Sequence, residues 1–375
     1  MMRVLHVYKN YFPTVGGIEN HVRLLCHELQ KLDVEPAVLV ANTSRRTQVD
    51  QVGGVRVTRA GRIGFAASTP LSLSLFRQMQ IQRPDLVHLH FPYPIGELAY
   101  LLCGHHARLV ITYHADIVKQ KKLLLVYGPF MRAILRRADR ILISNPRLLE
   151  TSPHLTPVAD KCVTIPFGLD LSQFEITAQV RARAAEIRQQ AGKPIVLFVG
   201  LLRYYKGLDY LLRAMPTVDA HLRLVGQGPM EGELRQLTTE LGLGDRVRFC
   251  GQVDDQELLA SYHAAEIFVL PSSHRSEAFG LVQLEAMACG LPVICTELGT
   301  GTTYVNRHGE TGLVVPPRDP AALAETLNVL LRDAELRQRL GQGGLARVRR
   351  DFNARRMADE VLSIYQEMSR DRRAP

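Results

Sequence analysis

The chain has 375 residues, of which 46% are hydrophobic and 22% are charged, with a formal net charge of +9. This composition is typical of a globular protein with room for two domains, and it excludes a disordered or fibrous chain. No apolar run approaches the roughly 18 residues of a membrane span, and the first residues are too polar for a signal peptide.

The net charge and the cysteines indicate which partners and which compartment to expect. A basic protein suits acidic ligands or an anionic membrane surface, and no aromatic and basic nucleic-acid module is visible. We therefore expect no nucleic acid as a partner. The cysteines lack paired spacing, so we expect reduced thiols in a cytoplasmic protein, neither zinc ligands nor disulfides; they are Cys26, Cys103, Cys162, Cys250, Cys289 and Cys295.

Short β-branched runs alternate with helix-length amphipathic stretches along the whole chain, which predicts parallel sheets covered by helices, an α/β fold. The expected strands of the first half are 3–8, 36–41, 55–59, 86–90, 109–113, 140–144 and 162–166. Those of the second half are 194–199, 222–225, 247–250, 267–270, 293–295 and 312–315. A turn-rich break at 167–170 separates the halves. We expect two Rossmann-like domains, 1–167 and 168–352, facing one another across a ligand cleft, followed by a last segment, 353–375, with a helix over 353–370.

The first loop that could approach a ligand follows the first strand. It contains Gly16 and Gly17, just before a helix that we expect to begin near Ile18. Glycines let the backbone come close to a ligand, although a pair of turn glycines is a weak signal on its own.

Histidines mark the next strands. His88 and His90 have the His-x-His spacing that places both on one face of a strand. With no third ligand nearby in the sequence, packing and cleft-lining roles are favoured over a metal site. His114 ends the following strand, and the carboxyl ends of parallel strands are where such folds bind ligands. A purely structural histidine is an equally good interpretation at that position.

The segment 119–140 mixes basic and apolar residues. Such a segment can lie on an anionic membrane surface, and an ordinary surface helix with a solvated charged face is the alternative. Its basic residues are Lys119, Lys121, Lys122, Arg132, Arg136, Arg137 and Arg140.

Cations cluster at the start of the second half. The strand 194–199 runs into Gly200, and Arg203 and Lys206 follow before a helix. Cations at such a place would neutralise the charge that develops on a departing diphosphate.

The most specific block runs from Ser276 to Glu285, between a strand and a helix. The backbone amides of 279–281 are expected at a helix N-terminus, where phosphate binds well. Glu277 stands before this helix and Glu285 within it. One carboxylate can therefore face a group in front of the phosphate and the other a group beside it, and a nucleotide sugar has that layout. Two solvated charges are the alternative.

The block from Pro271 to Pro317, with its Glu, seven residues, Glu pattern, resembles the retaining glycosyltransferases of family 4, and the resemblance extends over nearly the whole chain. It implies the GT-B fold, with an acceptor-side first domain, a nucleotide-sugar-binding second domain, the active site in the cleft between them, and a last helix that crosses back to the first domain. The catalytic residues that it implies are His114, Glu277 and Lys206, and we expect Arg203 to reach the same phosphate in place of the family's arginine. The donor-binding residues are Gly16, Gly17, Gly200, Ala278, Phe279, Gly280, Leu281, Val282, Glu285, Gly226, Gln252 and Val253.

One position departs from the family. The arginine that follows the glycine in the family is Leu201 here, and Arg203 lies two residues further on. Loss of one phosphate cation typically costs on the order of 100-fold or more in rate.

A narrower likeness, carried by 201–207 and 297–302, is to bacterial transferases that add mannose or rhamnose to surface polysaccharides. It implies a GDP-linked donor, with a UDP-sugar as the alternative, and a lipid-linked glycan acceptor at the inner face of the membrane. The chain has no Asp-x-Asp motif, so we expect a metal-independent reaction without a cofactor. Two other interpretations stay open: a sugar-nucleotide epimerase of the same fold, and a weakened relative that binds a nucleotide sugar.

Overall fold

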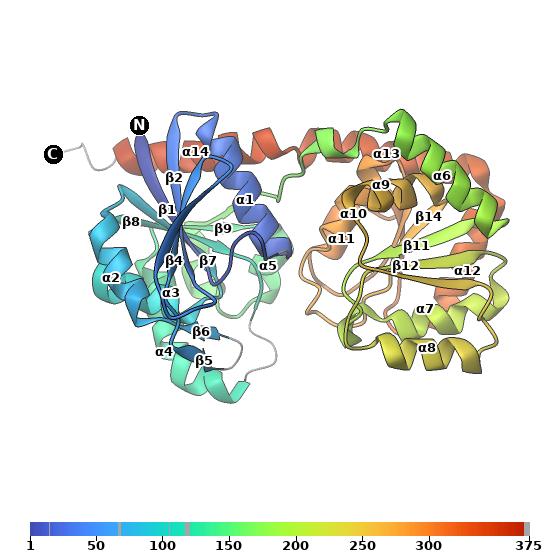
Figure 1. Cartoon of the computed structure of the whole chain (residues 1–375), viewed down its shortest axis with the longest axis horizontal. Coiled ribbons are helices and arrows are strands. Elements are labelled where there is room, and N and C mark those ends of the chain that lie inside the picture. The colour runs from blue at the N-terminus through green and yellow to red at the C-terminus, as the bar shows by residue number, and fades with distance from the viewer. Residues whose placement is uncertain (15, 67–68, 105, 117–120, 371–375) are drawn as a thin grey trace. The chain divides into compact units, whose positions relative to one another are not determined.

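The computed structural model of the chain describes residues 1–14, 16–66, 69–104, 106–116 and 121–370, and within these the side chains of all but 66 and 121–126. It contains two compact units, Met1–Gly168 with Ala354–Pro375, and Leu169–Asn353 (Figure 1). Each unit is built around its own sheet. Within the described ranges, no helix combines the length and the apolar character that crossing a bilayer requires.

An eight-stranded sheet forms the first unit, in the order β10-β9-β8-β7-β1-β2-β4-β3. Its strands are β1 (Met2–Val7), β2 (Val34–Ala41), β3 (Gln48–Val52), β4 (Val55–Ala60), β7 (Leu86–Phe91), β8 (Arg108–Tyr113), β9 (Arg140–Ile143) and β10 (Cys162–Thr164), and β5 (Gly64–Ala66) pairs separately with β6 (Thr69–Leu71). The helices are α1 (Gly17–Gln30), α2 (Leu73–Gln82), α3 (Pro94–Ala99), α4 (Lys121–Arg137), α5 (Pro146–Thr151) and α14 (Ala354–Arg370). The strand order reverses between β1 and β7, the point at which open parallel sheets bind ligands.

The two faces of this sheet differ in chemistry. Side chains alternate between the faces of a strand, and one face is an apolar core that includes Leu5, Val7, Val87, Leu89, Leu109 and Ile111. On β1, β7 and β8 the other face is apolar near the amino ends, where Val4, Leu86 and Val110 pack with side chains of α1 and α14. Further along the same strands the buried residues of this face are polar: His6, His88, His90 and Thr112. The histidines therefore form a layer beneath the carboxyl edge of the sheet.

The second unit has a six-stranded parallel sheet in the order β13-β12-β11-β14-β15-β16. Its strands are β11 (Ile195–Val199), β12 (His221–Val225), β13 (Val247–Gly251), β14 (Ile267–Leu270), β15 (Val293–Thr296) and β16 (Gly312–Val315). The helices are α6 (Ala178–Ala191), α7 (Leu208–Ala214), α8 (Glu231–Glu240), α9 (Asp255–Ala264), α10 (Val282–Ala288), α11 (Thr302–Val305), α12 (Pro320–Arg332) and α13 (Ala334–Asp351). The order is that of a Rossmann sheet, and it reverses between β11 and β14.

The last helix belongs to the first unit, as the resemblance implied. Met357, Val361 and Tyr365 of α14 are buried in a core shared with α1 and the sheet. The Tyr365 hydroxyl also lies 2.6 Å from Nδ1 of His88. A hydrogen bond between segments 277 residues apart thus ties the end of the chain to β7.

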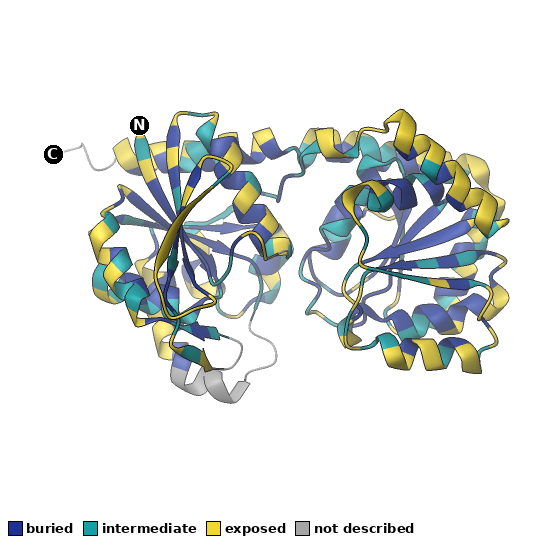
Figure 2. Ribbon diagram, viewed as in Figure 1, coloured by how far each residue is buried: buried dark blue, intermediate teal, exposed yellow. Residues whose placement is uncertain are grey.

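The predicted strands are all present, with ends shifted by at most two residues. The expectation of purely parallel sheets was wrong at β3, which pairs antiparallel with β4 and is exposed along most of its length (Figure 2). β3 is polar and lies at the edge of the sheet, so no apolar run marks it. The Gly53-Gly54 pair before β4, with φ of 58° and 80°, is a hairpin turn, and it is the feature of the sequence that indicates this strand pair.

Candidate active site

The loops at the reversal point of the second sheet bring Lys206 and Glu277 together. Lys206 closes a single turn, Tyr204–Lys206, after β11, and Glu277 lies in the loop between β14 and α10. The Lys206 ammonium donates to Glu277 Oε2 at 2.5 Å, and both residues are only 8% exposed. Because an ammonium carries three donors, Lys206 can bond Glu277 and an oxyanion at the same time.

The Glu277 segment is held on both sides by hydroxyl groups. Ser272 Oγ lies 3.3 Å from Glu277 Oε2, and Thr300 Oγ1 donates to the Glu277 carbonyl at 2.8 Å. Gly301 N–H donates to the Ala278 carbonyl at 2.8 Å. The loop after β14 is thereby fixed to the loop after β15.

A glycine lets the Lys206 turn approach β14. Gly207 has φ of +65°, and a Cβ there would lie 2.1 Å from the Pro271 carbonyl oxygen. Any side chain would push the turn away from the end of β14. Gly207 therefore sets the separation of Lys206 from Glu277.

The position of the family arginine is a surface position. Leu201 is 50% exposed and Arg203 is also exposed, on the same loop as the buried Lys206. The structure brings Lys206 to Glu277 and leaves Arg203 at the outside of the loop. Among the predicted cations, only Lys206 is part of the buried pair.

The segment predicted to bind the donor, Ala278 to Val282, forms the turn that leads into α10. Phe279 and Gly280 are buried, whereas Ala278, Leu281 and Val282 are partly exposed. Gly280 has φ of +76°, a conformation that favours glycine.

Glu285 lies on α10, and Tyr262 of α9 donates to its Oε2 at 2.8 Å. Burial raises the pKa of Glu285, while the Tyr262 hydroxyl opposes this shift. Glu277 and Glu285 thus have different partners, an ammonium and a phenol.

The loops after β12 and β13 pack against the loop after β11, which begins at Gly200. A Cβ on Gly226, where φ is +127°, would meet the Gly200 carbonyl at 2.1 Å. Gln227 Nε2 donates to Oε1 of the exposed Gln252 at 3.1 Å, and Val253 follows, partly exposed. Gly200, Gly226 and Gln252 therefore border one edge of the sheet.

In the first unit, Gly16 and Gly17 begin α1. A Cβ on Gly16 would lie 2.4 Å from Oε2 of Glu19, which is itself buried. The glycine thus makes room for a carboxylate in the first turn of the helix.

His114 lies among four other buried histidines, His6, His21, His88 and His90. Nδ1 of His6 lies 3.1 Å from Nε2 of His90, and Nδ1 of His90 lies 3.2 Å from Nε2 of His114. The His21 ring, from α1, packs 5.4 Å from the His114 ring. Burial lowers the pKa of all five, of His6 and His21 to about 3, so the cluster is uncharged at neutral pH.

The expectation that His88 and His90 lack a third candidate metal ligand was wrong. Histidines from β1, from α1 and from the end of β8 lie beside them. Two groups have one ring nitrogen each within 4.8 Å of one another: His6, His88 and His90, and His21, His90 and His114. Both ring nitrogens of His88 already contact hydroxyls, Tyr365 and Thr112, and both of His90 contact histidines. A metal would have to break these bonds, so the residues fit a hydrogen-bonded cluster better than a metal centre.

His6, His21 and Tyr262 contact predicted site residues but were not predicted themselves. His6 interrupts the apolar strand 3–8, and His21 interrupts an apolar helix stripe that includes Val22 and Leu25. A histidine within an apolar run on each of several adjacent strands would have been the signal for the cluster. Nothing local in the sequence marks Tyr262 as the partner of Glu285.

Comparison with known proteins agrees with this architecture. Residues 15–173 match a model described as Glycosyltransferase Family 4, and residues 181–347 match Glycosyl transferases group 1. The chain is 40% identical over 356 residues to D-rhamnosyltransferase WbpZ of Pseudomonas aeruginosa, covering 94% of this chain and 93% of that protein. It is 37% identical to O-antigen chain mannosyltransferase C of Escherichia coli, covering 97% and 98%.

Among solved structures, a sucrose-phosphate synthase from Thermosynechococcus elongatus matches with a TM-score of 0.84 and 26% identity, covering 99% of this chain and 100% of that one. Two Rossmann-like units, each with its strand order reversed beside the predicted site residues, are the framework that such enzymes share. The chain belongs to the GT-B glycosyltransferases of the family 4 type.

Proposed function

We propose that this glycosyltransferase moves mannose or rhamnose, with retention of the anomeric configuration, from a GDP-sugar to a lipid-linked glycan during O-antigen synthesis. The two relatives above are named for these sugars, one of them as an O-antigen chain enzyme. A UDP-sugar donor is the alternative. The observation that carries the proposal is the buried pair of Lys206 and Glu277 at the reversal point of the second sheet.

The pair suits a donor whose diphosphate leaves. The bond between the anomeric carbon and the phosphate oxygen breaks, and the acceptor oxygen bonds the same face of that carbon. The departing phosphate oxygen takes the acceptor proton, so no side chain has to act as a general base. Lys206 neutralises the diphosphate, and Arg203, exposed on the same loop, takes the role of the missing arginine.

The carboxylates orient the two ends of the donor. Glu277, held by Lys206 and Ser272, accepts hydrogen bonds from sugar hydroxyls, and Glu285, held by Tyr262, accepts them from the ribose. His114 donates to the sugar from the first unit. Because cations of the protein supply the charge on the diphosphate side, the reaction is proposed to proceed without a metal.

The membrane part of the proposal rests on α4. Lys119 lies outside the described residues, as do the side chains of 121–126. In the remainder of α4, Met131, Ile134 and Leu135 are buried in the core. Arg132, Arg136 and the 49% exposed Phe130 lie on the outside, and we propose that this basic face meets the headgroups around the lipid-linked acceptor.

The test is a transfer assay with GDP-mannose, GDP-rhamnose and UDP-glucose on a lipid-linked acceptor, with and without EDTA. We expect transfer from one GDP-sugar, resistant to EDTA, with the donor's α configuration in the product by NMR. An inverted product would refute retention. Donor binding without transfer to any acceptor would support a weakened relative, which the exposed Leu201 favours.

A further inference from the structure

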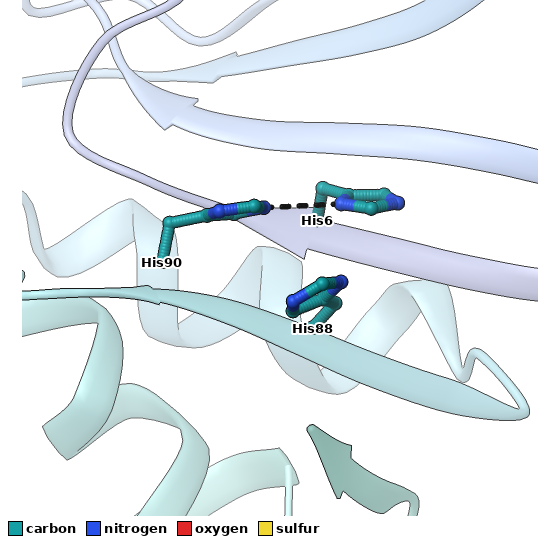
Figure 3. Close-up of side chains that lie close together, drawn as sticks. All are labelled: His6, His88 and His90. Carbon is teal, nitrogen blue, oxygen red and sulfur yellow. Dashed lines mark hydrogen bonds between the residues drawn. The ribbon is translucent and has the colours of Figure 1, made fainter. Parts of the chain in front are cut away.

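Three of the buried histidines are joined into a chain. His6 Nδ1 lies 3.1 Å from His90 Nε2, and His90 Nδ1 lies 3.2 Å from His114 Nε2. Figure 3 shows the first of these contacts, with the His6 ring reaching across from β1 to His90 on β7. All three side chains are buried, so water does not compete for these bonds.

The geometry couples the proton positions of the three rings. A neutral imidazole has one N–H donor and one acceptor nitrogen. Each contact joins an Nδ1 to an Nε2, so a proton on His6 Nδ1 requires His90 to accept at Nε2 and donate from Nδ1. His114 must then accept at Nε2 and carry its own proton on Nδ1. The three rings are therefore all Nδ1–H or all Nε2–H.

The two outer ring nitrogens of this hydrogen-bonded series decide which of the two tautomer states is favoured. His114 Nδ1 and His6 Nε2 are buried and have no hydrogen-bond partner among the described residues. When a sugar hydroxyl bonds His114 Nδ1, the Nδ1–H state leaves a bare acceptor on His6, and the opposite state leaves a buried N–H there. Orphaned buried N–H groups are the rarer of the two.

We propose that His6 and His90 are positioning residues that hold His114 in the Nδ1–H tautomer, so that this nitrogen donates to an oxygen of the donor sugar. The proposal deepens the proposed function, in which His114 contacts the sugar. Neither His6 nor His90 touches the donor; both act through His114.

His88 supplies an internal comparison. It lies two residues from His90 on the same strand, and Figure 3 shows its ring beside the other two. Its ring nitrogens contact the Tyr365 hydroxyl at 2.6 Å and Thr112 Oγ1 at 2.7 Å. Since its partners are hydroxyls, which can donate or accept, His88 is outside the coupled chain.

The direct test is nitrogen NMR of the full chain with ¹⁵N-labelled histidine, assigned with single variants. We expect His6, His90 and His114 all to be neutral and all Nδ1–H when the sugar donor is bound. Mixed tautomers, a charged ring, or stoichiometric zinc by elemental analysis would overturn the proposal. This measurement does not use turnover, so its failure is distinct from failure of the transferase assignment.

A kinetic series tests the consequence. His6→Asn keeps an amide near the Nδ1 position, whereas His6→Leu removes the bond to His90. We expect kcat/KM to fall about 10-fold in His6→Leu, the scale of one buried hydrogen bond, and to stay within about 2-fold in His6→Asn. Tyr365→Phe removes a bond to His88 and should lower Tm while leaving kcat/KM unchanged. Equal losses in His6→Leu and Tyr365→Phe would mean general destabilisation and would refute the positioning role.

Discussion

Lys206 and Glu277, 71 residues apart in the chain, form an ion pair at 2.5 Å with side chains that are 10% and 11% exposed. Lys206 follows β11 and Glu277 follows β14, the two strands between which the strand order reverses. The pair is thus a product of the sheet topology, and it lies where an open α/β sheet binds its ligand.

Removal of one partner of this pair should destabilise the protein more than removal of both. Lys206→Met leaves an unpaired buried carboxylate, and we expect a loss of about 3 kcal/mol in the free energy of unfolding. Lys206→Met with Glu277→Gln should recover most of that loss. Urea unfolding measures both, and an additive double variant would contradict a direct interaction. Activity should stay at least about 100-fold below wild type in both variants.

The role of Arg203, the exposed cation on the Lys206 loop, can be tested by moving the arginine back to position 201. Arg203→Ala should lower kcat on the order of 100-fold if Arg203 replaces the family arginine, and adding Leu201→Arg to Arg203→Ala should restore part of it. Arg235→Ala, which breaks an exposed pair with Glu231 on α8, is the matched control for charge. Full activity of Arg203→Ala would assign the phosphate charge to Lys206 alone.

Tyr262 should affect nucleotide binding through Glu285. Tyr262→Phe removes the hydroxyl that lies 2.8 Å from Glu285 Oε2 and opposes the rise of its pKa. We expect the Kd for the nucleotide to rise about 5-fold, the scale of one hydrogen bond. Calorimetric titration measures this, with Tyr210→Phe on α7 as a control for the substitution. An unchanged Kd would argue that Glu285 does not contact the ribose.

Acid should unfold the first unit through its histidines. Burial lowers the pKa of His6 and His21 to about 3, from a model-peptide value of 6.5, and lowers the pKa of His88, His90 and His114 as well. The folded state therefore binds fewer protons, so stability is complete above pH 6.5 and falls as pH drops from 6.5 toward 3.

Each such histidine adds about 1.4 kcal/mol per pH unit within that window. Urea unfolding measured between pH 5 and 8, at intervals of about half a pH unit, would give the slope of the free energy of unfolding against pH. His6→Asn should reduce it by one histidine's share. A flat stability profile below pH 6.5 would mean that the cluster is already charged or solvated when folded.

The strands could be predicted from the sequence because their patterns are local. The β-branched runs 267–270 and 312–315 coincide with β14 and β16. The edge strand β3 was not predicted because it is exposed and polar, so that no apolar run marks it.

The pairings within the site were beyond local patterns. The contact of Lys206 with Glu277 depends on two loops from different strands, and that of His6 with His90 on the register of β1 with β7. The spacing of residues along the chain carries no information about the packing of these two loops or about the register of these two strands. For the same reason the histidine cluster was taken for a His-x-His pair without a third neighbour.

The proposed function depends on the second unit binding a nucleoside diphosphate through Lys206. The most direct measurement is thermal stability of the wild type and of Lys206→Met during titration with GDP and UDP in the presence of EDTA. A ligand at about 100 times its Kd should add roughly 2.7 kcal/mol to stability. We predict this upshift with GDP in the wild type and its loss in Lys206→Met. No shift with either nucleotide, or an equal shift in the variant, would refute diphosphate binding through Lys206.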